Sequence, residues 1–298
     1  MLKKLILITL VMIVFSTLVV FGVTFYKKKD PVYKSSKYSF FVAGHVYGKP
    51  GQLDKTGLHP AFKLAFDSIR NKSIDFGVFA GDSVIRSTPS RYSALKRDIK
   101  LLGIPIHLVL GNHEVANDIP KGTMDKNFPE KFYFWVTNND LHIVLDSVSD
   151  GWNIEGTQLQ FIRETLVAND LTRNVFIYTH NTIWWNKENY QELMLPNSFW
   201  GRNKKSNFWT EFVPILKATQ KPVYLFAGDV GASLDRTFAF YQKIDKIHLI
   251  ATGMGGGKDD NFLITHVDDN HQVSFELIAL NGDNPSRLGS LESHTGIK

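Results

Sequence analysis

Five short apolar runs that each end at a polar residue constrain this 298-residue chain most strongly. They are rich in β-branched and aromatic residues, as buried strands are, and Gly, Asp, Asn or His follows closely. The runs are 38–43, 76–80, 104–110, 175–179 and 223–227. Parallel strands of a sheet place their carboxyl ends at one edge, so we expect the polar residues after these runs to meet there.

Helical patterns between these runs predict an α/β domain. Four segments have apolar residues at helical spacing: 60–71, 90–102, 157–168 and 208–218. Pro214 is expected to kink or restart the last of these helices. Two further strand patterns, 132–136 and 141–145, flank the turn residues Asn138, Asn139 and Asp140, which predicts a hairpin. Strand patterns dominate from 237 to 280.

The polar residues after the runs form an ordered series of motifs. In chain order they are His45, Gly81-Asp82, Gly111-Asn112-His113-Glu114, His180 and Gly228-Asp229-Val230-Gly231. Their order and spacing resemble the calcineurin-like metallophosphoesterase superfamily over residues 38–266. The resemblance implies a four-layer αββα sandwich of two mixed β-sheets, and a hydrolase that cleaves phosphoester bonds with water activated by divalent metal ions.

The resemblance also implies a set of metal ligands, namely His45, Asp82, Asn112, His180 and Asp229. Family members hold two ions, but three family positions differ here: Ala43 and Ile85 each replace an Asp, and Gly231 replaces a His. We therefore expect one strong site built from Asp82, Asn112, His180 and Asp229. His45 would add a ligand or hold a weak second ion.

The expected cofactor is a divalent ion, with Mn²⁺, Fe²⁺ and Zn²⁺ as candidates. An Asp in place of a His at position 229 shifts the preference toward harder ions. By the same resemblance His113 is the general acid that protonates the leaving oxygen, and Arg86 binds the phosphate group. Ile85 removes the carboxylate that would orient His113. A surface position is the plain alternative for Arg86.

A long uncharged segment lies near the N-terminus. Leu5 to Tyr26 contains 22 residues without a charge, and a helix of roughly 1.5 Å per residue and this length spans the ~30 Å core of a bilayer. We expect a single-pass transmembrane signal anchor there, since no Ala-x-Ala-like exit follows a short apolar core. The expected organisation is a short basic tail (1–4), the anchor (5–26), a basic linker (27–37), the metallophosphoesterase-like domain (38–280) and a polar tail (281–298).

The charge distribution bears on partners and location. Residues 1–30 contain five lysines and one aspartate, so most of the net charge of +5 lies beside the expected anchor. The rest of the chain lacks the basic surplus of a nucleic-acid-binding protein, whereas the linker suits anionic lipid headgroups. We expect a cell-membrane protein with an extracytoplasmic catalytic domain. The lysines after the anchor favour the cytoplasmic alternative.

An aromatic-rich segment separates His180 from Phe208. It contains Trp184, Trp185, Tyr190, Phe199 and Trp200. Such side chains stack on sugars and lie at lipid interfaces, so a lid over a phosphorylated glycan, a lipid-linked phosphoester or a lipid phosphoester is one interpretation, and a hydrophobic plug is the other. The alternative to an enzyme is a degenerate member of the fold that binds glycan or lipid or assembles the envelope.

Overall fold

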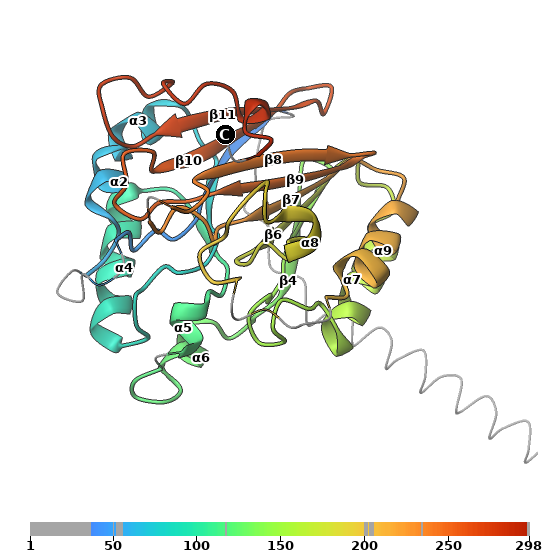
Figure 1. Cartoon of the computed structure of the whole chain (residues 1–298), viewed down its shortest axis with the longest axis horizontal. Coiled ribbons are helices and arrows are strands. Elements are labelled where there is room, and N and C mark those ends of the chain that lie inside the picture. The colour runs from blue at the N-terminus through green and yellow to red at the C-terminus, as the bar shows by residue number, and fades with distance from the viewer. Residues whose placement is uncertain are drawn as a thin grey trace, which may run out of the picture.

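The computed structural model describes residues 37–49, 51, 56–116, 118–199, 202, 206–233 and 235–296. Two β-sheets lie at its centre (Figure 1). The five-stranded sheet contains β1 (Tyr38–Ala43), β2 (Phe76–Phe79), β3 (Ile106–Leu108), β10 (Asn261–Val267) and β11 (Val273–Ala279). The six-stranded sheet contains β4 (Tyr133–Thr137), β5 (Asp140–Val144), β6 (Val175–Thr179), β7 (Val223–Ala227), β8 (Ala239–Ile244) and β9 (Ile247–Thr252).

Both sheets are mixed, which confirms the expected pair of mixed sheets. Their strand orders are β11-β10-β1-β2-β3 and β4-β5-β6-β7-β9-β8. The strands β1, β2 and β3 run parallel, as do β5, β6, β7 and β9, and the other strands are antiparallel to their neighbours. The parallel strands of each sheet therefore end together at one edge.

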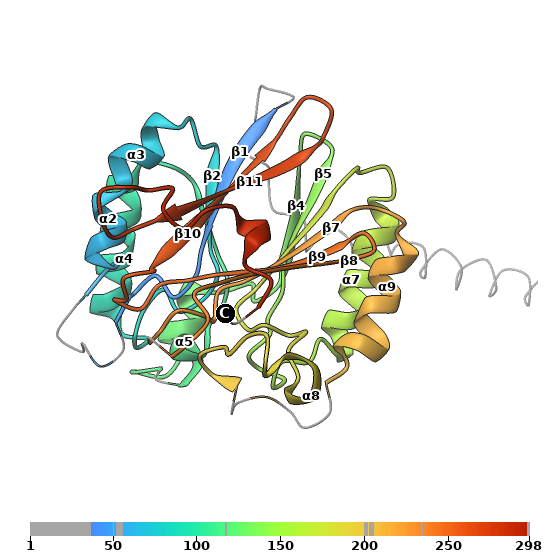
Figure 2. The same cartoon turned by 45° about the horizontal axis from the view of Figure 1, so that its top comes forward.

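Helices cover the outer faces of the sheets (Figure 2). Beside the five-stranded sheet lie α2 (Pro60–Leu64), α3 (Phe66–Asn71) and α4 (Pro89–Leu102). Beside the six-stranded sheet lie α7 (Gly156–Ala168) and α9 (Val213–Ala218), which continues from the π-helix η2 (Phe208–Phe212). Short helices in the connecting segments are α5 (Asn112–Ala116), α6 (Thr123–Asn127), α8 (Lys187–Tyr190) and the 3-10 helix η3 (Leu291–Ser293). The layers run helix, sheet, sheet, helix.

The alternation of side chains along β1 shows how the layers are held together. Tyr38, Phe40 and Val42 point into the apolar cluster between the two sheets. Phe41 and Ala43 point the other way, into the cluster beneath α2, α3 and α4. Because both faces of this strand are buried, its sequence is continuously apolar rather than alternating with polar residues.

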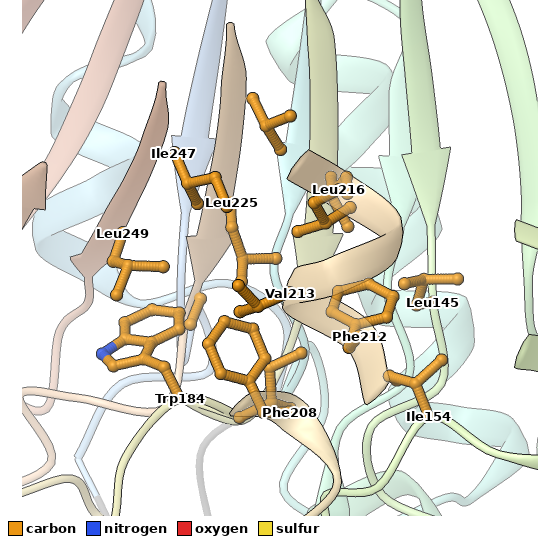
Figure 3. Close-up of a cluster of buried hydrophobic side chains, with 14 of the residues drawn as sticks. Leu145, Ile154, Trp184, Phe208, Phe212, Val213, Leu216, Leu225, Ile247 and Leu249 are labelled. Carbon is orange, nitrogen blue, oxygen red and sulfur yellow. The ribbon is translucent and has the colours of Figure 1, made fainter. Parts of the chain in front are cut away.

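A third apolar cluster lies under the helices of the six-stranded sheet (Figure 3). Helical side chains from η2 and α9 face side chains from β7 and β9, with Trp184 beside them: Phe208, Phe212, Val213, Leu216, Leu225, Ile247 and Leu249. Pro214 stands at the start of α9, where its missing N–H costs little, so the expected restart of the helix is confirmed.

Two predicted elements differ in detail. The expected helix over 60–71 is divided at Ala65 into α2 and α3. The strand expected over 104–110 is shortened to β3, and Asn112 begins the short helix α5 soon after it. Both differences are local, because tertiary contacts decide the ends of short elements more than residue preference does.

The ends of the chain bear on the membrane prediction. Within the described ranges, no helix combines the length and the apolar character needed to cross a bilayer. The expected tail, anchor and most of the linker (1–36) lie outside the described residues. In the polar C-terminal tail, Leu291 is fully buried and joins the cluster between the sheets.

A buried polar network lies between the sheets, at the edge where strands begin. The Tyr38 hydroxyl donates to Asp140 Oδ2 (2.9 Å) and lies 3.1 Å from His142 Nε2. On the other side of the ring, Nδ1 lies 2.9 Å from the Tyr178 hydroxyl. Burial, and secondarily the charge of His107, lower the pKa of His142 well below its usual value. His142 is therefore neutral in the folded protein.

This neutrality predicts a pH dependence of stability. The pKa of His142 is depressed in the folded protein, so below the unfolded-state pKa of about 6.5 the unfolded chain binds one proton more than the folded protein does. As the pH falls below that value, the free energy of unfolding therefore decreases by up to about 1.4 kcal/mol per pH unit. Urea unfolding at pH 7.5 and pH 5 should show a smaller drop for His142→Gln than for the wild type. An equal drop in both proteins would contradict the assignment.

Candidate functional site

The ends of strands from both sheets meet at one point, as the motif order predicts. The N–H of Asp229, after β7, donates to the carbonyl of His180, after β6 (2.9 Å). The N–H of His45, after β1, donates to the carbonyl of Gly81, after β2 (3.3 Å). The two sheets touch at Gly44 and Gly228, where a side chain on either glycine would collide with backbone of the other.

The backbone is constrained where the ligands are expected. His45 and Asp82 both have positive φ, 56° and 53°, although neither is a glycine. A non-glycine residue in this region is held by its surroundings, and such residues concentrate at functional sites. Gly81 lies against the His180 ring and leaves no space for a side chain.

Three of the predicted ligand atoms lie within 4 Å of a fourth, His180 Nε2. His180 Nε2 lies 2.8 Å from Asn112 Oδ1, 3.5 Å from Asp82 Oδ1 and 3.8 Å from Asp229 Oδ1. Ligands roughly 2.0–2.2 Å from a shared ion lie roughly 3 Å from one another. We call Asp82, Asn112, His180 and Asp229 the four-ligand cluster. The structure brings together all four members of the expected strong site.

The tautomer of His180 supports a cation at this position. Its Nδ1 lies 3.0 Å from the carbonyl oxygen of Ala80, which can only accept, so Nδ1 carries the hydrogen. In a neutral ring, Nε2 and Asn112 Oδ1 then face each other as two acceptors, 2.8 Å apart. A cation, or in its place a proton, between the two atoms stabilises this arrangement.

Asp229 provides a second test of whether a metal fits. Its Oδ2 accepts hydrogen bonds from Ser198 Oγ and from Asn181 Nδ2 (3.1 Å). Its Oδ1 is buried and has no hydrogen-bond partner among the described residues. The two donors therefore orient the carboxylate so that one oxygen remains for an ion, as outer hydrogen bonds do at metal sites. The donor set of oxygens and one imidazole suits a divalent cation.

His45 and His113 approach the same cluster from the other side of Asp82. Ligand atoms of His45, Asp82 and His113 all lie within 4.8 Å of one another. His45 Nε2 is 3.6 Å from Asp82 Oδ2, and its Nδ1 is held by the carbonyl of Met254 (2.8 Å). This second group shares Asp82 with the four-ligand cluster, as a bridging carboxylate would.

The departures from the family pattern are visible in the second group. Ala43 lies in the apolar cluster and offers no donor. Gly231 adopts φ 81° and packs against the backbone of Gly253. Neither position can supply a ligand side chain, so this group is poorer in donors than the four-ligand cluster.

The electrostatics give two of the ligands, Asp82 and His45, the protonation states that a metal requires. Burial raises the pKa of Asp82, but the imidazoles of His180, His113 and His45 together bring it below its usual range. Burial lowers the pKa of His45 to about 4, against the opposing effect of Asp82. An ionised Asp82 and a neutral His45 are competent ligands. At the other two titratable ligands the electrostatics favour the proton: burial raises the pKa of Asp229, and at His180 burial lowers the pKa, but the charges of Asp82 and Asp229 together raise it above its usual value.

His113 is held from both sides. Its Nδ1 lies 3.1 Å from the carbonyl of Ile85, so the backbone of this residue, rather than a carboxylate side chain, fixes the ring. Its Nε2 faces the Tyr47 hydroxyl at 3.1 Å and Asp82 Oδ2 at 4.0 Å. Tyr47 is buried and its ring lies 4.9 Å from that of His113. The sequence did not identify Tyr47, although it follows His45 by two residues.

Glu114 has a structural position that sequence reasoning missed. Its buried carboxylate accepts the N–H groups of Asp82 (3.1 Å), Ser83 (2.6 Å), Val84 (3.0 Å) and Gly111 (2.9 Å). It thereby ties the loop that carries Asp82 to the loop that carries Asn112. Burial, and then the charge of Asp82, raise its pKa to about 7.

Arg86 stands apart from the other predicted site residues. It is exposed in the segment between β2 and α4. Its guanidinium makes no hydrogen bond or ion pair with any residue that the structure describes. Its phosphate-binding role stays a prediction.

The aromatic segment after His180 is largely a plug. Trp184, Trp185 and Tyr190 are buried in the cluster under the six-stranded sheet, and Phe199 packs against it. Trp200 lies outside the described residues. The burial of the first three side chains favours the plug over the lid. From this segment Asn181 and Ser198 reach the site, where both donate to Asp229.

Comparisons with known proteins agree with this geometry. A relative 28% identical over 106 residues is the probable glycerophosphodiester phosphodiesterase GpdQ of Arcobacter nitrofigilis, and the match spans 34% of this chain and 36% of that protein. Two solved structures share the fold: a dimetal phosphatase from Danio rerio (TM-score 0.55, 13% identity, 86% of this chain and 98% of that one) and the purple acid phosphatase PPD1 from yellow lupin, Lupinus luteus (TM-score 0.60, 12% identity, 86% and 54%). The model of the calcineurin-like phosphoesterase family matches residues 45–253. The chain belongs to the calcineurin-like phosphoesterase family, a family of phosphoester hydrolases.

Proposed function

We propose that this protein hydrolyses a phosphoester with one strongly bound divalent cation, held by Asp82, Asn112, His180 and Asp229. The observation that carries the proposal is the unpaired, buried Oδ1 of Asp229, which lies 3.8 Å from His180 Nε2. A buried carboxylate oxygen without a donor is unfavourable unless a cation or a proton binds it, and burial raises the pKa of Asp229 accordingly. Mn²⁺, Fe²⁺ and Zn²⁺ are the candidates, and His45 adds a ligand or a weak second site.

In this mechanism a bound cation supplies the charge that activates water and polarises the phosphoester. His113 protonates the oxygen of the departing group through Nε2, since its Nδ1 is committed to the carbonyl of Ile85. The Tyr47 hydroxyl, 3.1 Å away, holds Nε2 at the position from which the proton leaves. Arg86, exposed on the segment after β2, would bind the phosphate oxygens.

The proposed substrate is a phosphorylated glycan, a lipid-linked phosphoester or a lipid phosphoester. We further propose that residues 5–26 anchor the protein in the cell membrane by a single span, with the catalytic domain on the extracytoplasmic side. The 22 uncharged residues of this segment support the span.

The alternative function is a glycan- or lipid-binding or envelope assembly module without hydrolysis. The loss of donors at Ala43 and Gly231 supports it. The retained His113, whose Nε2 faces the cluster with Tyr47, favours the enzyme. Metal analysis separates the two: the enzyme carries a stoichiometric ion and loses thermal stability with chelators, whereas the binding module does neither.

His113→Ala is the test of the reaction. With a glycerophosphodiester, whose alkoxide is a poor leaving group, we expect turnover to fall by about 10²- to 10⁴-fold with added Mn²⁺. The loss should be smaller with bis-p-nitrophenyl phosphate, because p-nitrophenolate leaves without a proton. Metal content should be unchanged.

His266→Ala is the matched control, since His266 is a partly exposed histidine on β10 that bonds Ser39. Equal losses with both esters would remove His113 from the role of acid. A fall in metal content would place it among the ligands, with His45 and Asp82.

A further inference from the structure

The edge of the sheets opposite the four-ligand cluster has features of its own. The described domain begins there, because Tyr38 is the first residue of β1. Figure 2 shows the start of β1 at the top of the view and α5 and α8 near the bottom. The helices α4, α7 and α9 also end at this edge, because each precedes a parallel strand. We call it the entry edge.

Large apolar side chains are exposed at the entry edge. Leu101 and Val167 are the penultimate residues of α4 and α7, and they are 66% and 78% exposed. Leu171, between α7 and β6, is 86% exposed. Leu101 lies at the end of the helix outside the five-stranded sheet, and Val167 and Leu171 lie at or after the end of the helix outside the six-stranded sheet, so both outer layers present exposed apolar side chains at this edge.

A groove includes one of these residues, Val167, in its wall. It has a volume of about 330 Å³ and lies between α7 and α9, and its lining combines the apolar residues Leu166, Val167, Ile215 and Ala218 with the charged residues Arg163, Asp170 and Lys221. Arg70, Lys100 and Lys217 lie in the last turns of their helices at this edge. The charge is mixed, since Lys217 pairs with Asp245 (2.7 Å), so the apolar residues carry more weight than the cations.

The length of the linker limits the distance between the entry edge and the expected anchor. Residues 27–37 separate Tyr26, the last residue of the uncharged segment, from β1. Eleven residues span at most ~36–40 Å when fully extended. If residues 5–26 cross the membrane, β1 therefore begins within ~36–40 Å of it, and the lysines of the linker attract anionic headgroups.

We propose that the entry edge rests on the surface of the phospholipid bilayer, with Leu101, Val167 and Leu171 at the level of the headgroups. This inference rests on the proposed membrane anchor. It has a consequence for the substrate. Strands of five residues, at roughly 3.3 Å each, separate this edge from the cluster, so the reacting groups lie well above the bilayer. Among the proposed substrates this orientation favours a phosphorylated glycan, which reaches the cluster from the aqueous side, over a lipid phosphoester of the same leaflet.

Because the sequence contains no cysteine, an introduced thiol is the only one that a fluorophore can label. In the experiment the full-length variants Leu171→Cys and Leu101→Cys are each labelled at the introduced thiol with a nitrobenzoxadiazole fluorophore. The labelled proteins are then reconstituted in vesicles of phosphatidylcholine and phosphatidylglycerol. Ile119→Cys is the matched control, because Ile119 is 56% exposed on the segment between α5 and α6, at the cluster edge. Nitroxide-bearing lipids then report which labels contact the bilayer.

We expect the labels at 171 and 101 to be quenched at least ~2-fold more strongly than the label at 119, because interfacial apolar groups enter the boundary by ~5–10 Å. Equal quenching at both edges of vesicle-bound protein would overturn the docking inference while leaving the anchor in place. Protection that depends on the protein-to-lipid ratio would assign the edge to a second copy and overturn it as well. Protein that does not float with vesicles would overturn the anchor, and the inference with it.

Discussion

Asp82→Asn is expected to abolish hydrolysis and to lower metal affinity by more than about 100-fold. Loss of a partner outside the ligand shell alone costs 10- to 100-fold at metal sites, and Asp82 lies at the centre of both donor groups. It faces His180 at 3.5 Å, His45 at 3.6 Å and His113 at 4.0 Å. An amide keeps the shape but loses the negative charge. Metal content of the purified variant and turnover with added Mn²⁺ are the two measurements.

Asp146→Asn is a suitable control, because Asp146 is also a buried carboxylate after a strand, where it accepts N–H groups of its own loop. It should retain the ion and turnover. Full activity of Asp82→Asn at saturating Mn²⁺ would remove Asp82 from the ligand set.

Glu114→Gln is expected to lower the free energy of unfolding by about 3–5 kcal/mol. One carboxylate accepts four buried N–H groups, and each donor left without an acceptor costs about 1–3 kcal/mol. The amide of Gln supplies one acceptor oxygen and one group that can only donate, so the N–H groups on one side become unpaired. Urea unfolding with a chelator present measures the effect on the chain alone.

Glu130→Gln is the control, since Glu130 is exposed and the same change should be within about 0.5 kcal/mol of the wild type there. If both variants unfold alike, the loop contacts of Glu114 do not stabilise the domain. The pKa of about 7 is consistent with this role of Glu114. Near neutral pH a substantial fraction of its carboxylate is ionised, and the ionised form accepts all four donors.

The sequence alone predicts the bounds of three strands that lead to the ligands. The bounds of β1, β6 and β7 are those of the apolar runs, because each strand is buried on both faces and its composition reports that burial directly. Strand polarity brings together the ligands that follow strands of one sheet. The approach of Asp82 to His180, with 3.5 Å between Oδ1 and Nε2, depends instead on how the two sheets pack, because these residues follow strands of different sheets.

Other parts of the site could not be predicted, because they depend on contacts between distant segments. Ser198 donates to Asp229 from the segment between His180 and Phe208, for which the prediction rested on the aromatic residues. Tyr47 meets His113 across 66 positions of the chain. Glu114 adjoins His113 in sequence but serves the neighbouring loop. Leu291 is an isolated apolar residue in a polar tail, a pattern that gives no periodicity to read.

The contact between Gly44 and Gly228 has a consequence for how such a protein works. The two sheets divide the ligands between them: His45, Asp82 and Asn112 follow strands of one, and His180 and Asp229 follow strands of the other. An ion bound by both groups of ligands links the two sheets where they meet, so the ion that serves catalysis also holds the two halves of the domain together. Any force that slides one sheet past the other separates the ligands while it disturbs the apolar cluster between the sheets.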